Sequence, residues 1–262
     1  MSVSGAGSVE QVDDLRWELV IFDNDGVVVD SEPLASVATS ETLTALGHPM
    51  TADECDQAFR GISLPTTRRL VEQASGRELP ADFEERYLAR VAQLLASELR
   101  PVPGIEAVLD LLDAAGLPYC MASSSRREVI SLALTTTGLA ERFAGRWWGA
   151  EDVADSKPAP DIFLLAARSM GARPENCVVV EDSEAGARAG RAAGMAVLGF
   201  AARTPPEQLA LSDEIFTNMA ELPALLLGSQ RAQVIADQCG EVAGHPVRRR
   251  LHGEVGGPGH SG

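Results

Sequence analysis

Residues that build several common kinds of protein site are scarce in this chain. Its 262 residues include four cysteines, far apart and without a CxxC pair, and four histidines, three of which fall in the last 18 residues. The cysteines therefore indicate small buried side chains in a reducing compartment, not a disulfide framework or a zinc site. With only His48 in the body of the chain, a Ser-His-Asp triad or a multi-histidine metal centre is not expected. Acid–base or metal chemistry must come from carboxylates.

Long apolar runs and an excess of positive charge are also missing. No segment approaches the roughly 20 apolar residues of a membrane span, and residues 1–15 lack the basic start and apolar stretch of a secretory signal. We therefore expect a cytoplasmic protein that does not contact a membrane. The net charge of −16 argues against nucleic acid as a partner. A small phosphorylated metabolite needs only a few local cations and is compatible with this charge. The sequence does not indicate an oligomeric state, and a monomer is compatible with it.

Lysine is nearly absent, since the 22 basic residues comprise 21 arginines and one lysine, Lys157. A lysine ammonium is a compact point charge, whereas an arginine guanidinium is a broad planar fork, so a confined site can require lysine. Lys157 is therefore a candidate functional residue. The alternative is an accidental surface lysine.

The apolar pattern alternates between short strand-like runs and amphipathic helical stretches. This alternation predicts an α/β fold, a doubly wound, Rossmann-like parallel sheet with an inserted α-helical cap. The expected division is a flexible tail over 1–15, a sheet core over 16–31 and 100–227, a helical cap over 32–99, and a disordered extension over 228–262.

Acidic residues follow two of the predicted strands. Asp23 and Asp25 come after the apolar run WELVIF, and Glu181 and Asp182 follow CVVV. The carboxyl ends of parallel strands meet at one edge of a sheet, so these groups are expected to converge. Clustered carboxylates repel unless a cation balances them, and oxygen ligands suit Mg²⁺. The alternatives are solvated turn residues for the first pair and ordinary helix-capping acids for the second.

The serine run at 123–125 lies where another predicted strand gives way to a helix. Hydroxyl groups and free backbone N–H groups at such a junction can hold a phosphate. Taken alone, the run is more typical of an ordinary helix N-cap. If phosphate binds there, Lys157 could balance charge on the phosphate and on an attacking carboxylate.

Four segments together resemble the motifs of the haloacid dehalogenase-like hydrolases. They are FDNDGVVVDSE at 22–32, ASSS at 122–125, SKPAPDIF at 156–163 and VVVEDSEAG at 178–186. Their order and spacing are similar to those of the branch that contains β-phosphoglucomutase and sugar phosphatases. The resemblance covers about 17–227 and implies a Rossmann-like core, a helical cap inserted after the first motif, and Mg²⁺.

The resemblance also implies roles for individual residues. Asp23 would be the nucleophile that becomes an aspartyl phosphate, and Asp25 would protonate the leaving oxygen and then activate water. The implied ligands of Mg²⁺ are Asp23, the backbone carbonyl of Asp25, and Asp182, with Glu181 adjacent or acting through water. The implied phosphate-binding groups are the Ser123 hydroxyl, backbone N–H groups near Asn24 and Ser124, and Lys157.

Two positions favour a phosphatase over a mutase. The family's mutase carries a histidine where this chain has Ala35 and an arginine where it has Leu64. The expected function is therefore Mg²⁺-dependent hydrolysis of a small phosphomonoester, such as a sugar phosphate. A β-phosphoglucomutase-type mutase and a protein that only binds a phosphorylated effector remain as alternatives. Candidate substrate contacts on the cap are Glu32, Arg60 and Ser63, with Thr66 and Thr67 nearby; an ordinary exposed helix end is the alternative for these last four.

Overall fold

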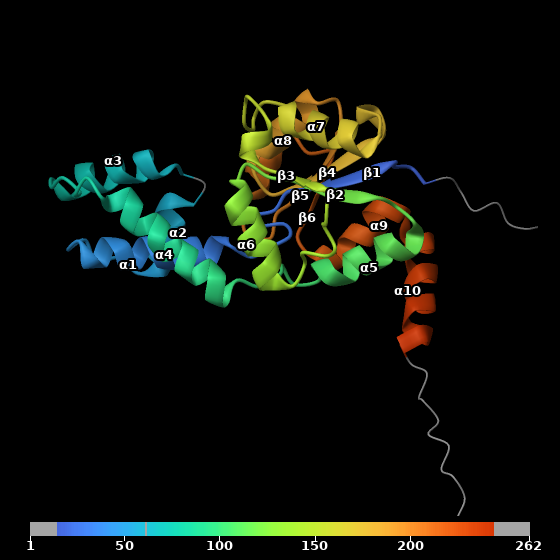
Figure 1. The fold of residues 1–262 in the computed structure, drawn as a ribbon, viewed down its shortest axis with the longest axis horizontal. Helices are drawn as coiled ribbons and strands as arrows, with labels where there is room; N and C mark the ends of the chain where they lie inside the picture. The colour runs from blue at the N-terminus through green and yellow to red at the C-terminus, as the bar shows by residue number, and fades with distance from the viewer. Residues whose placement is uncertain (1–14, 61, 244–262) are drawn as a thin grey trace, which may run out of the picture.

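A six-stranded parallel sheet forms the centre of the molecule (Figure 1). This computed structural model describes residues 15–60 and 62–243. The sheet has the strand order β3-β2-β1-β4-β5-β6, which confirms the predicted doubly wound α/β class. The strands are β1 (Leu19–Phe22), β2 (Tyr119–Ala122), β3 (Trp147–Trp148), β4 (Cys177–Glu181), β5 (Ala196–Phe200) and β6 (Glu214–Phe216).

Helices cover both faces of this sheet (Figure 1). The face formed by Val20 and Phe22 of β1 packs against α5 (Ile105–Ala115), α6 (Arg127–Thr137) and α9 (Leu222–Leu227). The opposite face packs against α7 (Asp161–Met170) and α8 (Glu184–Ala192). Because both faces are buried, the central strands are continuously apolar, as the runs LVIF and CVVV show.

Glycines end several of these helices where the sequence predicts. Gly116 follows α5 with φ of 65° and Gly171 follows α7 with φ of 73°. This left-handed conformation suits glycine because it has no Cβ. Each glycine turns the chain directly toward the next strand or short 3-10 turn.

The strand order reverses between β1 and β4. From β1 the chain runs outward through β2 to β3, and it then returns to β4 on the other side of β1 and continues to β5 and β6. In doubly wound sheets, ligands bind beyond the carboxyl ends of the strands at such a reversal. The residues that follow β1 and β4 therefore lie side by side at this edge.

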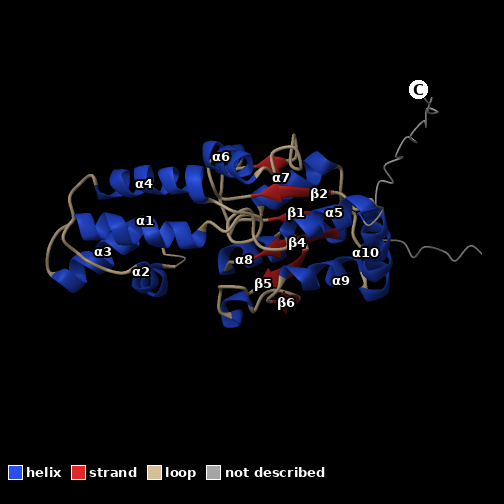
Figure 2. Ribbon diagram, turned by 90° about the horizontal axis from the view of Figure 1, so that it is seen from below, coloured by secondary structure: helices blue, strands red, loops and turns tan. Residues whose placement is uncertain are grey.

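A separate bundle of four helices is inserted after β1 and lies beyond the carboxyl edge of the sheet (Figure 2). It consists of α1 (Glu32–Ala45), α2 (Ala52–Phe59), α3 (Leu64–Ser75) and α4 (Phe83–Glu98). Thr51 starts α2 with a capping box, since its hydroxyl accepts from the Glu54 N–H while the Glu54 carboxylate accepts from the Thr51 N–H. The bundle has its own apolar core of Leu43, Cys55, Val71, Leu79 and Phe83. We call this bundle the cap.

The chain segments that enter and leave the cap lie next to each other. Asp30 donates its N–H to the Arg100 carbonyl, and Val29 forms an antiparallel bridge with Pro101. Both connections to the sheet core therefore run as one short two-stranded ribbon.

The prediction of a disordered extension from residue 228 is wrong for its first half. Ser229–Ala243 forms a helix, α10, which packs against α5 and α9 and buries Ala232 and Ile235. The mean hydropathy of this helix is low, but some of its apolar residues face inward, where α5 and α9 cover them. Residues 1–14 of the predicted N-terminal tail and 244–262 of the extension lie outside the described residues.

The predicted burial of the cysteines is confirmed where their side chains are described. Cys55, Cys120 and Cys177 are buried and free, and the side chain of Cys239 lies outside the described part. Within 15–60 and 62–243, no helix has both the length and the apolar character needed to cross a membrane.

Candidate active site

Three carboxylates meet at the carboxyl ends of β1 and β4. Asp23 follows β1, Glu181 is the last residue of β4, and Asp182 comes next; the three offer oxygen atoms within 4.8 Å of one another. Asp23 and Glu181 are 7% and 1% exposed. Buried carboxylates so close together repel one another, and the cluster is unstable unless positive charge balances it. The cations near the cluster therefore determine its charge state.

Lys157 supplies the positive charge that the structure shows. Its Nζ donates to Asp23 Oδ1 at 2.5 Å, to Glu181 Oε1 at 2.7 Å and to the Ala122 carbonyl at 3.0 Å. Burial alone lowers the pKa of Lys157, but the two carboxylates outweigh burial and raise this pKa above its usual range. The ammonium is therefore charged, and Lys157 is not an accidental surface lysine.

Both carboxylate oxygens of Glu181 accept hydrogen bonds from other groups of the protein. Oε1 accepts from Lys157, and Oε2 accepts from the Ser183 N–H at 2.9 Å and the Ser183 hydroxyl at 2.8 Å. A Cβ on Gly186 would overlap this carboxylate, so the first turn of α8 needs glycine there. Glu181 thus holds Lys157 beside Asp23.

Asp182 has no such partners. Its carboxylate forms no hydrogen bond or ion pair with any residue in the described part of the chain. Burial, reinforced by the nearby Glu181 and Asp23 charges, raises its pKa well above the usual value. Burial also raises the pKa of Asp23 to about 7, although Lys157 opposes this. One lysine therefore does not balance three acids, and the oxygen-only cluster fits a hard divalent cation such as Mg²⁺.

Asp25 lies apart from this cluster and is held by two serines. Its Oδ1 accepts from the Ser31 hydroxyl at 2.7 Å, and its Oδ2 accepts from the Ser125 hydroxyl at 2.8 Å. Ser31 precedes α1 of the cap, whereas Ser125 belongs to the sheet core. The carboxylate side chain of Asp25 is not part of the three-acid cluster, and the predicted metal contact through its backbone carbonyl stays a prediction.

Backbone N–H groups beside these acids are available to a ligand. The N–H groups of Asn24, Asp25 and Ser124 donate to no described acceptor. Ser123 is 1% exposed, and its oxygen accepts from the Ser125 N–H at 2.9 Å while its own proton stays available. The Asn24 side chain is fully buried with both amide atoms unpartnered, so any role in binding an anion belongs to its backbone. These groups together can cradle a phosphate.

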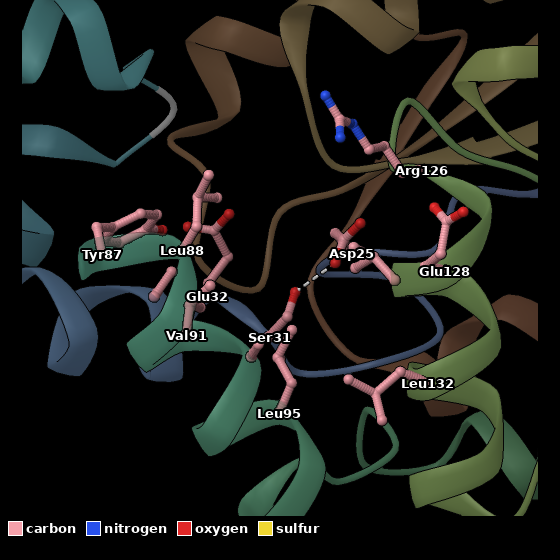
Figure 3. Close-up of a pocket in the computed structure, with 13 residues that line it drawn as sticks. Asp25, Ser31, Glu32, Tyr87, Leu88, Val91, Leu95, Arg126, Glu128 and Leu132 are labelled. Atoms are coloured by element: carbon pink, nitrogen blue, oxygen red, sulfur yellow. Dashed lines mark hydrogen bonds between the residues drawn. The ribbon is translucent and has the colours of Figure 1, made fainter. Parts of the chain in front are cut away.

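A cavity of about 640 Å³ opens beside Asp25, between the cap and the sheet core (Figure 3). Ser31, Glu32, Ala35 and Tyr87 line it from the side of the cap. The rest of the lining is Leu88, Val91, Ala92 and Leu95 of α4 with Arg126, Glu128, Val129 and Leu132 at α6. Burial and the neighbouring Asp25 charge raise the pKa of Glu32.

The predicted cap residues divide into three groups. Glu32 lines this cavity, and it also lines a smaller one of about 190 Å³ together with Arg60 and Thr67. Arg60 already has protein partners, since it pairs with Asp56 and donates to the backbone carbonyl of Arg203. Ser63 and Thr66 line neither cavity; the Ser63 hydroxyl donates to Thr66 Oγ1.

Sequence reasoning missed Ser31, Tyr87 and Arg126, and it placed Ser125 in the serine run without its contact with Asp25. Ser31 and Ser125 stand inside the quoted motifs, so their positions could have been noticed. Tyr87 has no signal of its own, because it is one residue of an amphipathic helix until the fold brings it to the cavity.

Comparisons with known proteins agree with this geometry. Residues 17–194 match the family described as haloacid dehalogenase-like hydrolase. The chain is 32% identical over 213 residues to the 6-phosphogluconate phosphatase of Escherichia coli, covering 80% of this chain and 95% of that protein. It is 33% identical to a fructose-1-phosphate phosphatase of the same organism, covering 69% of this chain and 94% of that protein.

A solved structure shows the same fold. A hydrolase of this family from Deinococcus radiodurans, with bound phosphate and sodium, superimposes with a TM-score of 0.74 at 29% identity, covering 83% of this chain and 98% of that one. The four motifs, the sheet order and these matches agree, and the chain belongs to the haloacid dehalogenase-like hydrolases.

Proposed function

We propose that this protein is a Mg²⁺-dependent phosphatase that hydrolyses a small phosphomonoester, a sugar phosphate or a related metabolite, through an aspartyl-phosphate intermediate. The observation that carries the proposal is the separation of two carboxylates: Asp23 lies in the charged cluster with Lys157, while Asp25 faces the adjoining cavity. The two E. coli relatives, named for 6-phosphogluconate and fructose 1-phosphate, support a phosphorylated sugar as the substrate class.

Asp23, Glu181 and Asp182 suit a divalent cation. Asp23, Asp182 and the backbone carbonyl of Asp25 would hold it, with Glu181 adjacent or acting through water. Bound Mg²⁺ would neutralise charge between the phosphate and the carboxylates. Lys157 neutralises further charge on Asp23 and fixes the position of its carboxylate. The Asn24 and Ser124 N–H groups and the Ser123 hydroxyl are placed to bind phosphoryl oxygens.

In the first step an Asp23 oxygen attacks phosphorus and the bond from phosphorus to the leaving oxygen breaks. Asp25 gives its proton to that oxygen, so a neutral alcohol departs into the cavity. In the second step Asp25 takes a proton from water as the water oxygen attacks phosphorus. The bond between phosphorus and the Asp23 oxygen breaks, inorganic phosphate leaves, and Asp23 and Asp25 return to their starting protonation states.

The mutase alternative is not favoured. Ala35 lines the cavity with a methyl group, so this position offers no polar group to direct the phosphoryl transfer to a second sugar hydroxyl. The two E. coli relatives are phosphatases by name. A purely binding role would not require both Asp23 and Asp25.

The test is release of inorganic phosphate from sugar phosphates, sugar-acid phosphates and hexitol phosphates, with Mg²⁺ and with EDTA. Asp23→Asn should lower turnover by about 10³-fold or more, because the amide is a poor nucleophile. Asp53→Asn, on the exposed side of α2, is the control and should keep the wild-type rate. Near-normal, Mg²⁺-dependent turnover in Asp23→Asn would refute the assigned nucleophile, and isomer formation without phosphate release would support the mutase.

A further inference from the structure

Two polar side chains of the cap face the large cavity without a partner. They are Glu32, at the start of α1, and Tyr87, on α4 (Figure 3). Neither side chain forms a hydrogen bond with another residue of 15–60 or 62–243. Both are half-buried, so they have lost part of their hydration without gaining a protein partner.

These two residues lie where a leaving group must pass. Glu32 and Tyr87 line both the 640 Å³ cavity and the 190 Å³ cavity, and Asp25 lines the larger one. In Figure 3 the Tyr87 ring lies beside Glu32, on the opposite side of the cavity from α6. An alcohol that takes a proton from Asp25 therefore has these two groups next to it.

The only other polar side chain that the described part of the cap side offers this cavity is Ser31, whose hydroxyl already donates to Asp25. The cap's remaining described contributions to the large cavity are apolar: Ala35, Leu88, Val91, Ala92 and Leu95. A carboxylate accepts hydrogen bonds from hydroxyl groups, and a phenol adds one donor and an apolar ring face. This combination suits a molecule with several hydroxyl groups on a carbon skeleton.

We propose that Glu32 and Tyr87 determine specificity by binding hydroxyl groups of the leaving alcohol, so that the protein selects phosphorylated sugars and polyols over hydroxyl-poor phosphomonoesters. The inference rests on the phosphatase activity proposed above. A leaving group without hydroxyls would displace water from Glu32 and return no hydrogen bond, and sites built in this way reject such analogues strongly.

The experiment compares kcat/KM for the best sugar phosphate among 6-phosphogluconate, fructose 1-phosphate and glucitol 6-phosphate with kcat/KM for p-nitrophenyl phosphate. The second probe has no hydroxyl on its leaving group. Glu32→Gln should lower the ratio of sugar phosphate to p-nitrophenyl phosphate by about tenfold or more, the worth of a hydrogen bond to a charged group. Tyr87→Phe keeps the ring and should lower the same ratio by a smaller factor, mainly through KM.

Glu85→Gln is the matched control, because Glu85 is exposed on α4 and lines neither cavity. It should leave the ratio of the two probes unchanged, and unfolding midpoints check that all three variants fold. An equal loss on both probes in Glu32→Gln would overturn the specificity role and leave the phosphatase proposal intact. Phosphate release from neither probe by the wild-type protein would overturn the phosphatase proposal and this inference with it.

Discussion

Lys157 joins the two buried acids Asp23 and Glu181, and its aliphatic stem and ammonium are 5% exposed. A buried charge without a partner costs several kcal/mol, so the three groups depend on each other. The ammonium also lies 4.7 Å from the centre of the Phe163 ring, which adds a further favourable contact. This single lysine therefore has a structural role as well as the proposed catalytic one.

Replacing this lysine should destabilise the fold as well as stop catalysis. Lys157→Met leaves Asp23 and Glu181 buried without their cation, and we expect the free energy of unfolding to fall by about 3–5 kcal/mol. Urea unfolding with EDTA present measures the loss without help from a metal ion. Arg168→Met, at an exposed position on α7, is the control and should change stability little. If Lys157→Met were as stable as the control, the ion-pair interpretation would be wrong.

At the residue scale, the acids and the lysine could be predicted because each follows a strongly apolar run or stands in a recognisable motif. The end of a parallel strand fixes where a side chain lies relative to the ends of neighbouring strands. The contacts of Asp25 with Ser31 and Ser125 could not be predicted, because they depend on how the cap connection folds back onto the sheet core. Tyr87 depends even more on the position of the cap.

At the scale of single elements, the start of β1 is attached to the turn before β4. The Glu18 carboxylate accepts from the Arg173 guanidinium at 3.0 Å, from the Arg173 N–H at 3.1 Å and from the Asn176 amide at 2.6 Å. The hydrogen bonds from Asn176 and Arg173 lower the pKa of Glu18 from 4.5 to about 2. These contacts lie at the edge of the sheet opposite the candidate active site.

This lowered pKa gives a stability change with a definite sign. A carboxyl group whose pKa is lower in the folded state stabilises the fold above pH 4.5, and the effect is lost as the pH falls toward about 2. Glu18→Gln should therefore be less stable than wild type at pH 7, and the difference should shrink as the pH falls below 4.5. Urea midpoints across this range measure it. Because the group is exposed, the change will be small, and a difference that grows on acidification would contradict the assignment.

The helix α10 shows why the sequence predicted its neighbours better than this element. The strands β1 and β4 can be predicted from unbroken apolar runs, and α5 can be predicted from regular apolar spacing before a glycine. Ser229–Ala243 contains no leucine, methionine or aromatic residue. Its inward positions Ala232 and Ile235 can be recognised only once α5 and α9 form the surface that they cover. Composition alone is typical of an unstructured tail there.

For the whole molecule, the main question is how the cap is held over the sheet core. The two connecting segments pair through Asp30 and Arg100, and the Asp30 carboxylate also pairs with Arg203 at 3.2 Å. The sequence predicted an inserted helical unit from the long block of helical residues after the first motif, but it could not place the cap on the core. That placement depends on a few contacts between residues far apart in the chain.

Arg60 makes one of these contacts, and its loss should loosen the attachment of the cap to the core. The guanidinium pairs with Asp56 inside the cap and donates to the Arg203 carbonyl in the core. Arg60→Ala should therefore speed amide hydrogen exchange in the core loop at 201–205 and raise KM, since closure over the substrate becomes less favourable. Arg68→Ala is the control, because Arg68 contacts Glu72 and the Leu79 carbonyl within the cap alone. If both variants changed the core loop equally, or neither did, Arg60 would have no special part in joining cap to core.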